Sequence, residues 1–163
     1  MSEVVILDLG ASVKGNCLID GADFKEKVIV ESYSHGVSLP MQGDASQAER
    51  TAGRPMFSEM SFSKMSDLST TEIYKACITG TNIPKATLWV GRVENGVYMG
   101  FFKYEFDNAM ISNMSTSGGG SLPRDSFSIC FTKIKCEFTQ QQSNSSKKGT
   151  GTWNWNAATM KSD

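Results

Sequence analysis

Hydrophobic and polar residues alternate along most of this 163-residue chain with the two-residue period of β-strands. The alternating segments are rich in β-branched and aromatic residues, and turn residues separate them, as in all-β domains. They are VVILDL, EKVIVESYS, MFSEMSFSK, KATLWVGRV, GVYMGFFKYEFDNAMIS, DSFSICFTKIKCEF and GTWNWN. The length and the pattern together predict one domain, dominated by β-strands.

The sequence VENGVY contains the clearest turn. Asn95 and Gly96 tolerate positive φ at both corner positions of a type I′ turn, so residues 86–106 are predicted to form one antiparallel hairpin. Alternation in its second arm predicts that one set of aromatic side chains faces a core: Tyr98, Phe102, Tyr104 and Phe106.

Two segments indicate sheets that are covered on both faces. The opposite face of the second hairpin arm begins apolar and becomes charged. In residues 127–138 the apolar parity changes near Thr132, which indicates a bulge or two buried faces. In so short a chain, this favours a β-barrel of two mainly antiparallel sheets whose outside packs on another subunit.

One segment, SDLSTTEIYKACITG, has the three-and-four spacing of a helix. We predict a short α-helix at about residues 70–79, with Ser69 as N-cap and Glu72 completing a capping box. Gly80 supplies the left-handed stop. A helix this short is marginal alone, so it must pack on the sheets.

Residues 36–55 form a loop that is long for a compact domain, which makes it either functional or disordered. It contains SLPM between polar stretches, an apolar segment with no local strand to bury it. Such a segment fits contact with a neighbouring subunit. Met41, Met56 and Met60 lie in or beside this loop, where flexible apolar side chains suit adaptable contacts.

Charge and apolar runs argue against several partners. Sixteen Lys and Arg against seventeen Asp and Glu give a net charge of -1, and the basic residues are scattered. We therefore expect no nucleic-acid partner. No segment approaches the ~20 apolar residues of a membrane span, and MSEVVILDLG does not resemble an export signal. We expect no membrane insertion and no cleavable signal peptide.

The sequence offers weak candidates for catalysis or metal binding. Four cysteines are expected to be free thiols: Cys17, Cys77, Cys130 and Cys136. His35 is the sole histidine, and the cysteines lack metal-ligand spacing, so no metal and no cofactor are predicted. A hydrolase that pairs a cysteine with His35 is one alternative. Another is a monomeric β-barrel that binds a small ligand in an interior pocket lined by Tyr98, Tyr104 and Phe106.

The segments HGVSLPM, TAGRPMFSEMSFSKMSDLSTTEIYKACITGTNIPKATLWV, NAMISNMSTSGGG, SFSICFTKIKCEF and WNWN follow one another in an order that resembles the Hcp (haemolysin-coregulated protein) family of the bacterial type VI secretion system. The resemblance covers nearly the whole chain. It implies a non-enzymatic tube subunit with one Hcp-like β-barrel domain over residues 1–163. Toxin-bearing members carry an extra C-terminal domain, and we expect no such effector extension here.

The resemblance also implies partners and a location. Six copies form a ring, rings stack into the inner tube, and the lumen can carry small effector proteins. Sheath, baseplate and spike components of the secretion system are the other implied partners. The protein would lie in the bacterial cytoplasm before firing and would then be secreted without a signal peptide.

Site residues follow from the same resemblance. Ser32 and Ser34 align with a strand that faces the lumen in the family, so they are expected to face cargo. In the family the long loop reaches towards a neighbour. The residues expected to make ring contacts are Leu39, Met41, Arg54 and Met56.

Overall fold

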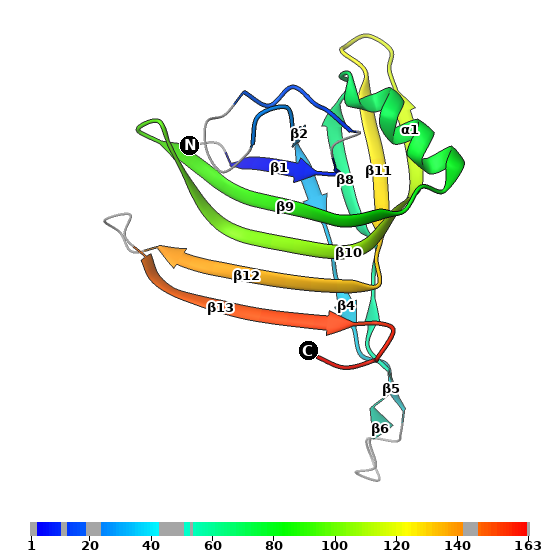
Figure 1. Cartoon of the computed structure of the whole chain (residues 1–163), viewed down its shortest axis with the longest axis vertical. Helices are drawn as coiled ribbons and strands as arrows, with labels where there is room; N and C mark the ends of the chain where they lie inside the picture. Colours follow the sequence, from blue (N-terminus) through cyan, green and yellow to red (C-terminus); the bar gives the residue numbers. More distant parts are fainter. Residues whose placement is uncertain are drawn as a thin grey trace.

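The computed structural model describes residues 3–10, 13–18, 24–42, 51–52, 54–141 and 147–162. Antiparallel strands dominate these residues, and one short helix packs beside them (Figure 1). The prediction of a mainly antiparallel β fold with a single short helix is confirmed.

The strands form two sheets that share one long strand. In the first sheet the order is β2 (Val28–Val30), β1 (Val4–Asp8), β9 (Ile83–Glu94), β10 (Val97–Ser117), β12 (Lys133–Gln141) and β13 (Lys147–Asn156). In the second sheet the later half of β10 pairs with β11 (Arg124–Cys130), followed by β8 (Met60–Met65) and β3 (Ser32–Ser34). Asn108, with φ of 52°, separates the two halves of β10. Strand β10 therefore turns the chain from one sheet into the other.

One edge strand of the first sheet, β2, and the edge strand of the second sheet, β3, meet at Glu31. Strands β2 and β3 are separated by this residue alone, and β2 pairs with β1 while β3 pairs with β8. The Glu31 N–H donates to the Ser63 carbonyl at 2.8 Å. Within the described residues, the strand pairing is thus interrupted at Glu31, between β2 and β3. The predicted barrel therefore has a break at this residue.

The hairpin prediction is confirmed, but one aromatic residue lies on the other face. Asn95 and Gly96 have φ of 52° and 77°, as a type I′ turn requires. A β-bulge between Gly100 and Phe102 changes the parity of β10. Tyr104 and Phe106 therefore pack in the main core between the sheets, whereas Tyr98 packs against Phe24 in a second cluster.

The prediction of a bulge or two buried faces near Thr132 is wrong. Strand β11 ends at Cys130, and β12 begins at Lys133. Strand β11 belongs to the second sheet and β12 belongs to the first sheet, so Phe131 and Thr132 connect the two sheets. The parity changes because the chain passes between sheets.

The helix α1 spans Ser69–Thr79, and Gly80 ends it in the left-handed conformation with φ of 62°, as predicted. The predicted start is wrong, because Ser69 is already helical and buried. The carboxylate of Asp67 accepts the Ser69 N–H at 2.8 Å, and the Asp67 N–H donates to Thr70 Oγ1 at 3.1 Å.

Glu72 makes no capping box. Because Asp67 and Thr70 already close the first turn, the Glu72 carboxylate is left to pair with Lys75 at 3.3 Å on the exposed side of the helix.

All four cysteines are free, and Cys17 and Cys136 are buried. Among the described residues, no helix has the length and apolar character needed to cross a membrane.

Candidate assembly surface

The described parts of residues 36–58 form a narrow arm that extends away from the two sheets (Figure 1). Near the sheets, β4 (Val37–Ser38) pairs with β7 (Met56–Phe57), and farther out β5 (Met41–Gln42) pairs with β6 (Thr51–Ala52). The Gly36 N–H donates to Ser58 Oγ at 2.8 Å and closes the base. Residues 43–50 and 53 of the predicted loop lie outside the described residues.

The residues predicted to make ring contacts all lie on this arm. Leu39, Met41 and Met56 expose 49%, 53% and 61% of their surface, and Arg54 is exposed too. Exposed apolar side chains on a projecting pair of strands gain free energy if another surface covers them. The arm is therefore suited to association.

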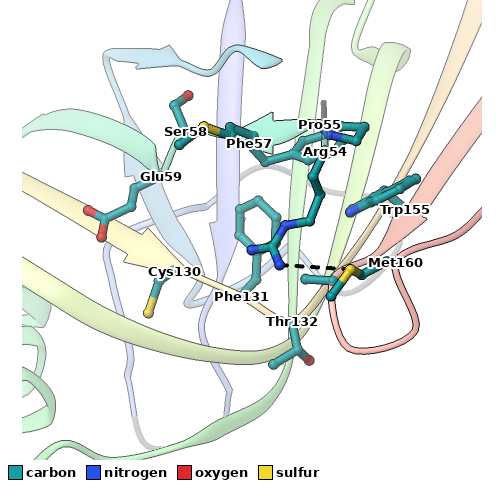
Figure 2. Close-up of a pocket in the computed structure, with 12 residues that line it drawn as sticks. Arg54, Pro55, Phe57, Ser58, Glu59, Cys130, Phe131, Thr132, Trp155 and Met160 are labelled. Atoms are coloured by element: carbon teal, nitrogen blue, oxygen red, sulfur yellow. Dashed lines mark hydrogen bonds between the residues drawn. The ribbon is translucent and has the colours of Figure 1, made fainter. Parts of the chain in front are cut away.

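A hollow of about 240 Å³ lies where the arm meets the sheets (Figure 2). Arg54 and Met56 line it from the arm. The Arg54 guanidinium reaches across to Met160 near the C-terminal end, with 3.8 Å between Nη1 and Sδ. The apolar residues that also line it are Phe57, Cys130, Phe131, Trp155 and Ala157. Leu39 and Met41, on the outgoing strand, are not among the lining residues.

Aromatic stacking holds the base of the arm to the first sheet. The rings of His35, Phe57 of the arm and Trp153 of β13 form an aromatic cluster, with centroids 5.9 Å apart for His35 and Phe57, 6.3 Å for His35 and Trp153, and 6.0 Å for Phe57 and Trp153. Tyr104 and Phe131 complete its surroundings. His35 Nε2 is buried and has no hydrogen-bond partner among the described residues, and burial lowers the pKa of the imidazole. His35 therefore acts as an aromatic packing residue, and among the described residues its Nε2 does not have the hydrogen-bonded partner that a catalytic base would have.

Ser32 and Ser34 belong to a larger polar face on the outside of the second sheet. They are exposed, while Tyr33 between them packs on the core. Register places Ser32 opposite Ser63, and Ser34 opposite Ser61. The pairing continues across β11 and β10 through Ser126, Ser128, Ser115 and Asn113. We call these eight residues the serine face, and none of them carries a charge.

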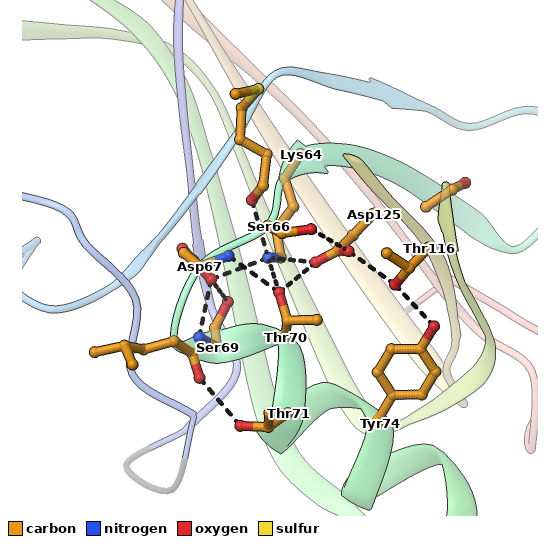
Figure 3. Close-up of polar contacts among 12 residues, drawn as sticks. Lys64, Ser66, Asp67, Ser69, Thr70, Thr71, Tyr74, Thr116 and Asp125 are labelled. Carbon is orange, nitrogen blue, oxygen red and sulfur yellow. Dashed lines mark hydrogen bonds and ion pairs between the residues drawn. The ribbon is translucent and has the colours of Figure 1, made fainter. Parts of the chain in front are cut away.

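A buried polar network joins α1 to the second sheet (Figure 3). Lys64 on β8 is fully buried, and its Nζ donates to Asp125 at 2.9 Å, Asp67 at 3.0 Å and Thr70 at 3.2 Å. Burial acts to raise the pKa of Asp125, but hydrogen bonds from Thr70, Lys64, Ser66 and Thr116 outweigh it and lower this pKa. The Asp125 carboxylate is therefore ionised beside the lysine, and the pair fixes the helix to the sheet.

The alternation of β8 contains a signal for this network that the sequence-based prediction did not include. Lys64 follows Met60 and Phe62 at alternate positions of β8, so it shares their buried face. A lysine on a buried face requires a carboxylate partner. Asp125 has the same relation to Phe127 and Ile129 on β11.

No group of three or more His, Cys, Asp or Glu that could hold a metal ion occurs in the described part of the chain. The candidate assembly surface consists of the arm, the hollow at its base and the serine face.

Comparisons with known proteins give the family model and the solved structures that this chain resembles. The family model "Type VI secretion system effector, Hcp" matches residues 6–138. A solved "type six secretion system protein" superposes with a TM-score of 0.87 at 19% identity, covering 99% of this chain and 100% of the other. Hcp1 from Salmonella typhimurium superposes with a TM-score of 0.79 at 19% identity, covering 100% of both chains. Secreted Hcp3 from Pseudomonas aeruginosa gives 0.63 at 11% identity, covering 92% and 97%. These likenesses show the fold, and a search of the curated proteins found no match.

Proposed function

Because this chain belongs to the Hcp family of type VI secretion tube proteins, which are structural and not enzymatic, we propose that it is a ring-forming subunit of the secretion tube. Six copies associate into a ring, and rings stack into a tube. The observation that carries this proposal is the projecting arm, whose Leu39, Met41 and Met56 are exposed. Burying them against a neighbour supplies a driving force that the isolated chain lacks.

The serine face is the proposed wall of the lumen. Its hydroxyl groups offer donors and acceptors without charge, and Ser61 and Ser128 already hydrogen-bond each other at 3.0 Å. A wall without charge on these eight residues lets effector proteins of either charge pass without strong retention, and Arg124 beside it is paired with Glu31. Ser32 and Ser34 contact the cargo at one edge of this wall.

The proposed partners follow from the family. They are the sheath, baseplate and spike components of the type VI machine and small effectors in the lumen. The protein leaves the bacterial cytoplasm by this route and is then extracellular.

The alternative of a monomeric ligand-binding barrel has less support. Tyr104 and Phe106 are buried in the main core, and Tyr98 lies on the opposite face of the first sheet. These three side chains therefore do not line one interior pocket.

The test is the mass of the purified protein, measured by light scattering on a sizing column. We expect six times the 17.8 kDa chain, and we expect a smaller species when residues 37–42 are replaced by a Gly/Ser linker. A chain that stays monomeric at high concentration contradicts the ring.

Two matched substitutions separate the lumen from the contact surface. Met56→Arg places a charge on the arm and should abolish rings, since an unpaired charge at an interface is costly. Ser126→Arg should leave the ring mass unchanged, because a lumen residue stays in water and its charge is screened over about 8 Å at physiological salt. Rings lost in the Ser126→Arg variant would place the serine face at an interface.

A further inference from the structure

The only histidine of the chain lies where the arm leaves the sheets. His35 directly follows β3 and precedes Gly36, the first residue of the arm. Two hydrogen bonds close the base of the arm beside it. The Gly36 N–H donates to Ser58 Oγ at 2.8 Å, and the Ser58 N–H donates to the Gly36 carbonyl at 2.9 Å. A movement of His35 therefore acts directly on these bonds.

The His35 side chain lies among aromatic rings from four parts of the fold. Besides Phe57 and Trp153, the centroids of Phe131 and Tyr104 lie 6.0 and 6.4 Å from the imidazole. Nε2 is buried and has no hydrogen-bond partner among the described residues. A neutral imidazole fits these surroundings, whereas a charged one loses its hydration without gaining a hydrogen-bond partner.

The titratable groups beside the imidazole keep one charge state near neutral pH. Tyr104 contacts His35, and Tyr33 and Cys136 lie next to Tyr104. Burial raises the pKa of all three groups, so they stay neutral. Burial lowers the pKa of His35 even though aromatic faces attract a cation, so the cost of desolvation exceeds the cation–π attraction.

Charged side chains from the elements that carry these rings have other partners. The contacts are Arg54 with Met160, Glu59 with Ser112 and, on β10, Lys103 with Glu105. Residues 130–132 and 149–157, around Phe131 and Trp153, carry no charge, and Cys130 is their only titratable group. Within the described residues, acid therefore places one new charge in these surroundings, on His35.

The base of the arm has few other contacts to hold it. Strands β4 and β7 pair at only two positions, Val37 with Phe57 and Ser38 with Met56. Phe57 thus takes part both in this short ladder and in the contact with His35. An imidazole that moves into water removes a ring from Phe57 and displaces the start of the arm at the same time.

We propose that His35 is a pH-sensitive hinge of the arm. In acid the imidazole takes up a proton and turns from the aromatic cluster into water, the base of the arm opens, and the ring of six copies dissociates. The inference rests on the proposed ring and adds a condition under which that ring comes apart. Secreted rings that meet acid would then release whatever their lumen holds.

Light scattering on a sizing column at pH 7.5 and pH 5, at one ionic strength, tests the hinge. We expect the wild-type share of rings to fall by about threefold or more at pH 5, since each copy takes up a proton on release. His35→Phe keeps an aromatic ring that cannot be protonated, so its ring mass should be the same at both pH values. All other titrating groups are common to the two proteins.

Hydrogen exchange measures the opening itself in a chain that forms no rings. In Met56→Arg, exchange of the Ser58 amide, corrected for its intrinsic pH dependence, should become about threefold faster or more from pH 7.5 to pH 5. Adding His35→Phe should remove this change. Because the chain has one histidine, its imidazole gives a single NMR titration, which should follow the change in exchange.

Wild-type rings that keep their mass at pH 5, or rings lost equally in His35→Phe, would overturn the hinge and leave the tube subunit intact. An imidazole that titrates while the Ser58 exchange stays constant would do the same. If His35→Phe forms no rings at pH 7.5, the exchange in Met56→Arg decides. A wild-type chain that forms no ring at pH 7.5 would instead contradict the proposed function.

Discussion

At the scale of single residues, the most constrained group is the buried ion pair between Lys64 and Asp125. Neither side chain is exposed, and hydrogen bonds from Lys64 to Asp67 and Thr70, and from Thr70 to Asp125, connect the helix start to the second sheet (Figure 3). A buried charge that loses its partner costs far more than the intact pair contributes. The network therefore acts mainly by penalising other arrangements of α1.

Lys64→Met should lower the free energy of unfolding by about 3–5 kcal/mol, because it leaves the Asp125 carboxylate buried and unpaired. Urea unfolding of the purified protein measures this. Combining Lys64→Met with Asp125→Asn should recover part of the loss, since the amide is neutral and still accepts a hydrogen bond. A double variant less stable than Lys64→Met alone would contradict this account.

His35 makes stability depend on pH. Its folded-state pKa is lowered by burial, so the unfolded chain binds a proton first as the pH falls. The contribution of the neutral imidazole is complete above the unfolded pKa of about 6.5 and is lost as the pH falls through 6.5 towards the folded pKa. The Asp125 carboxyl group responds at lower pH, because its hydrogen bonds lower its pKa.

We expect the wild-type protein to lose stability between pH 7.5 and pH 5, measured by urea unfolding. His35→Phe keeps an aromatic ring beside Phe57 and Trp153 and should lose less over the same range. Equal losses in both proteins would assign the pH dependence to other groups.

At the scale of elements, the two ends of α1 are fixed in different ways. A local glycine fixes the C-terminus, and contacts with a distant strand fix the N-terminus. The C-terminus depends on Gly80, whose N–H and left-handed conformation satisfy the last carbonyls. The N-terminus depends on Asp67, which is held in turn by Lys64. The end set by a single glycine was predictable, whereas the start set by a neighbouring strand was not.

Gly80→Ala should cost about 1 kcal/mol, because a residue with Cβ is strained at φ of 62°. For a protein of this size the melting temperature should fall by roughly 2–4 °C. Gly80→Asn is the control and should cost less, since asparagine tolerates the left-handed region. A fall for Asn as large as that for Ala would point to lost space and not to backbone strain.

At the scale of the whole molecule, the arm and α1 lie at opposite ends of the longest axis (Figure 1). The helix end is stabilised by buried polar bonds within the chain. The arm end has exposed apolar side chains, a hollow and the aromatic cluster of His35, Phe57 and Trp153. This difference is expected if the helix end is stable within one chain and the arm end is stabilised by contact with a neighbouring copy.

Association should therefore make stability depend on concentration. A ring that dissociates on unfolding gains stability by mass action, so tenfold dilution should lower the melting temperature of the wild-type protein. The variant with residues 37–42 replaced should show no such dependence. Differential scanning calorimetry at two concentrations distinguishes them, and a concentration-independent wild type would argue against the ring.

The sequence by itself determined the features that depend on local backbone preference. Alternation fixed most strands, Asn95 and Gly96 fixed the hairpin, and Gly80 fixed the helix end. The serine face also left a local trace, because the tripeptides SYS at 32–34 and SFS at 61–63 and 126–128 alternate in the same way on neighbouring strands.

Only the tertiary structure decided what depends on partners far apart in the sequence. Lys64 meets Asp125 across 61 positions, and the bulge after Gly100 moves Tyr98 to the other face. The hollow combines the arm, the end of β11 and the C-terminal residues. Hydrophobic alternation specifies which face of a strand is buried, but it does not specify which distant segment covers that face. The candidate assembly surface depends on those distant contacts.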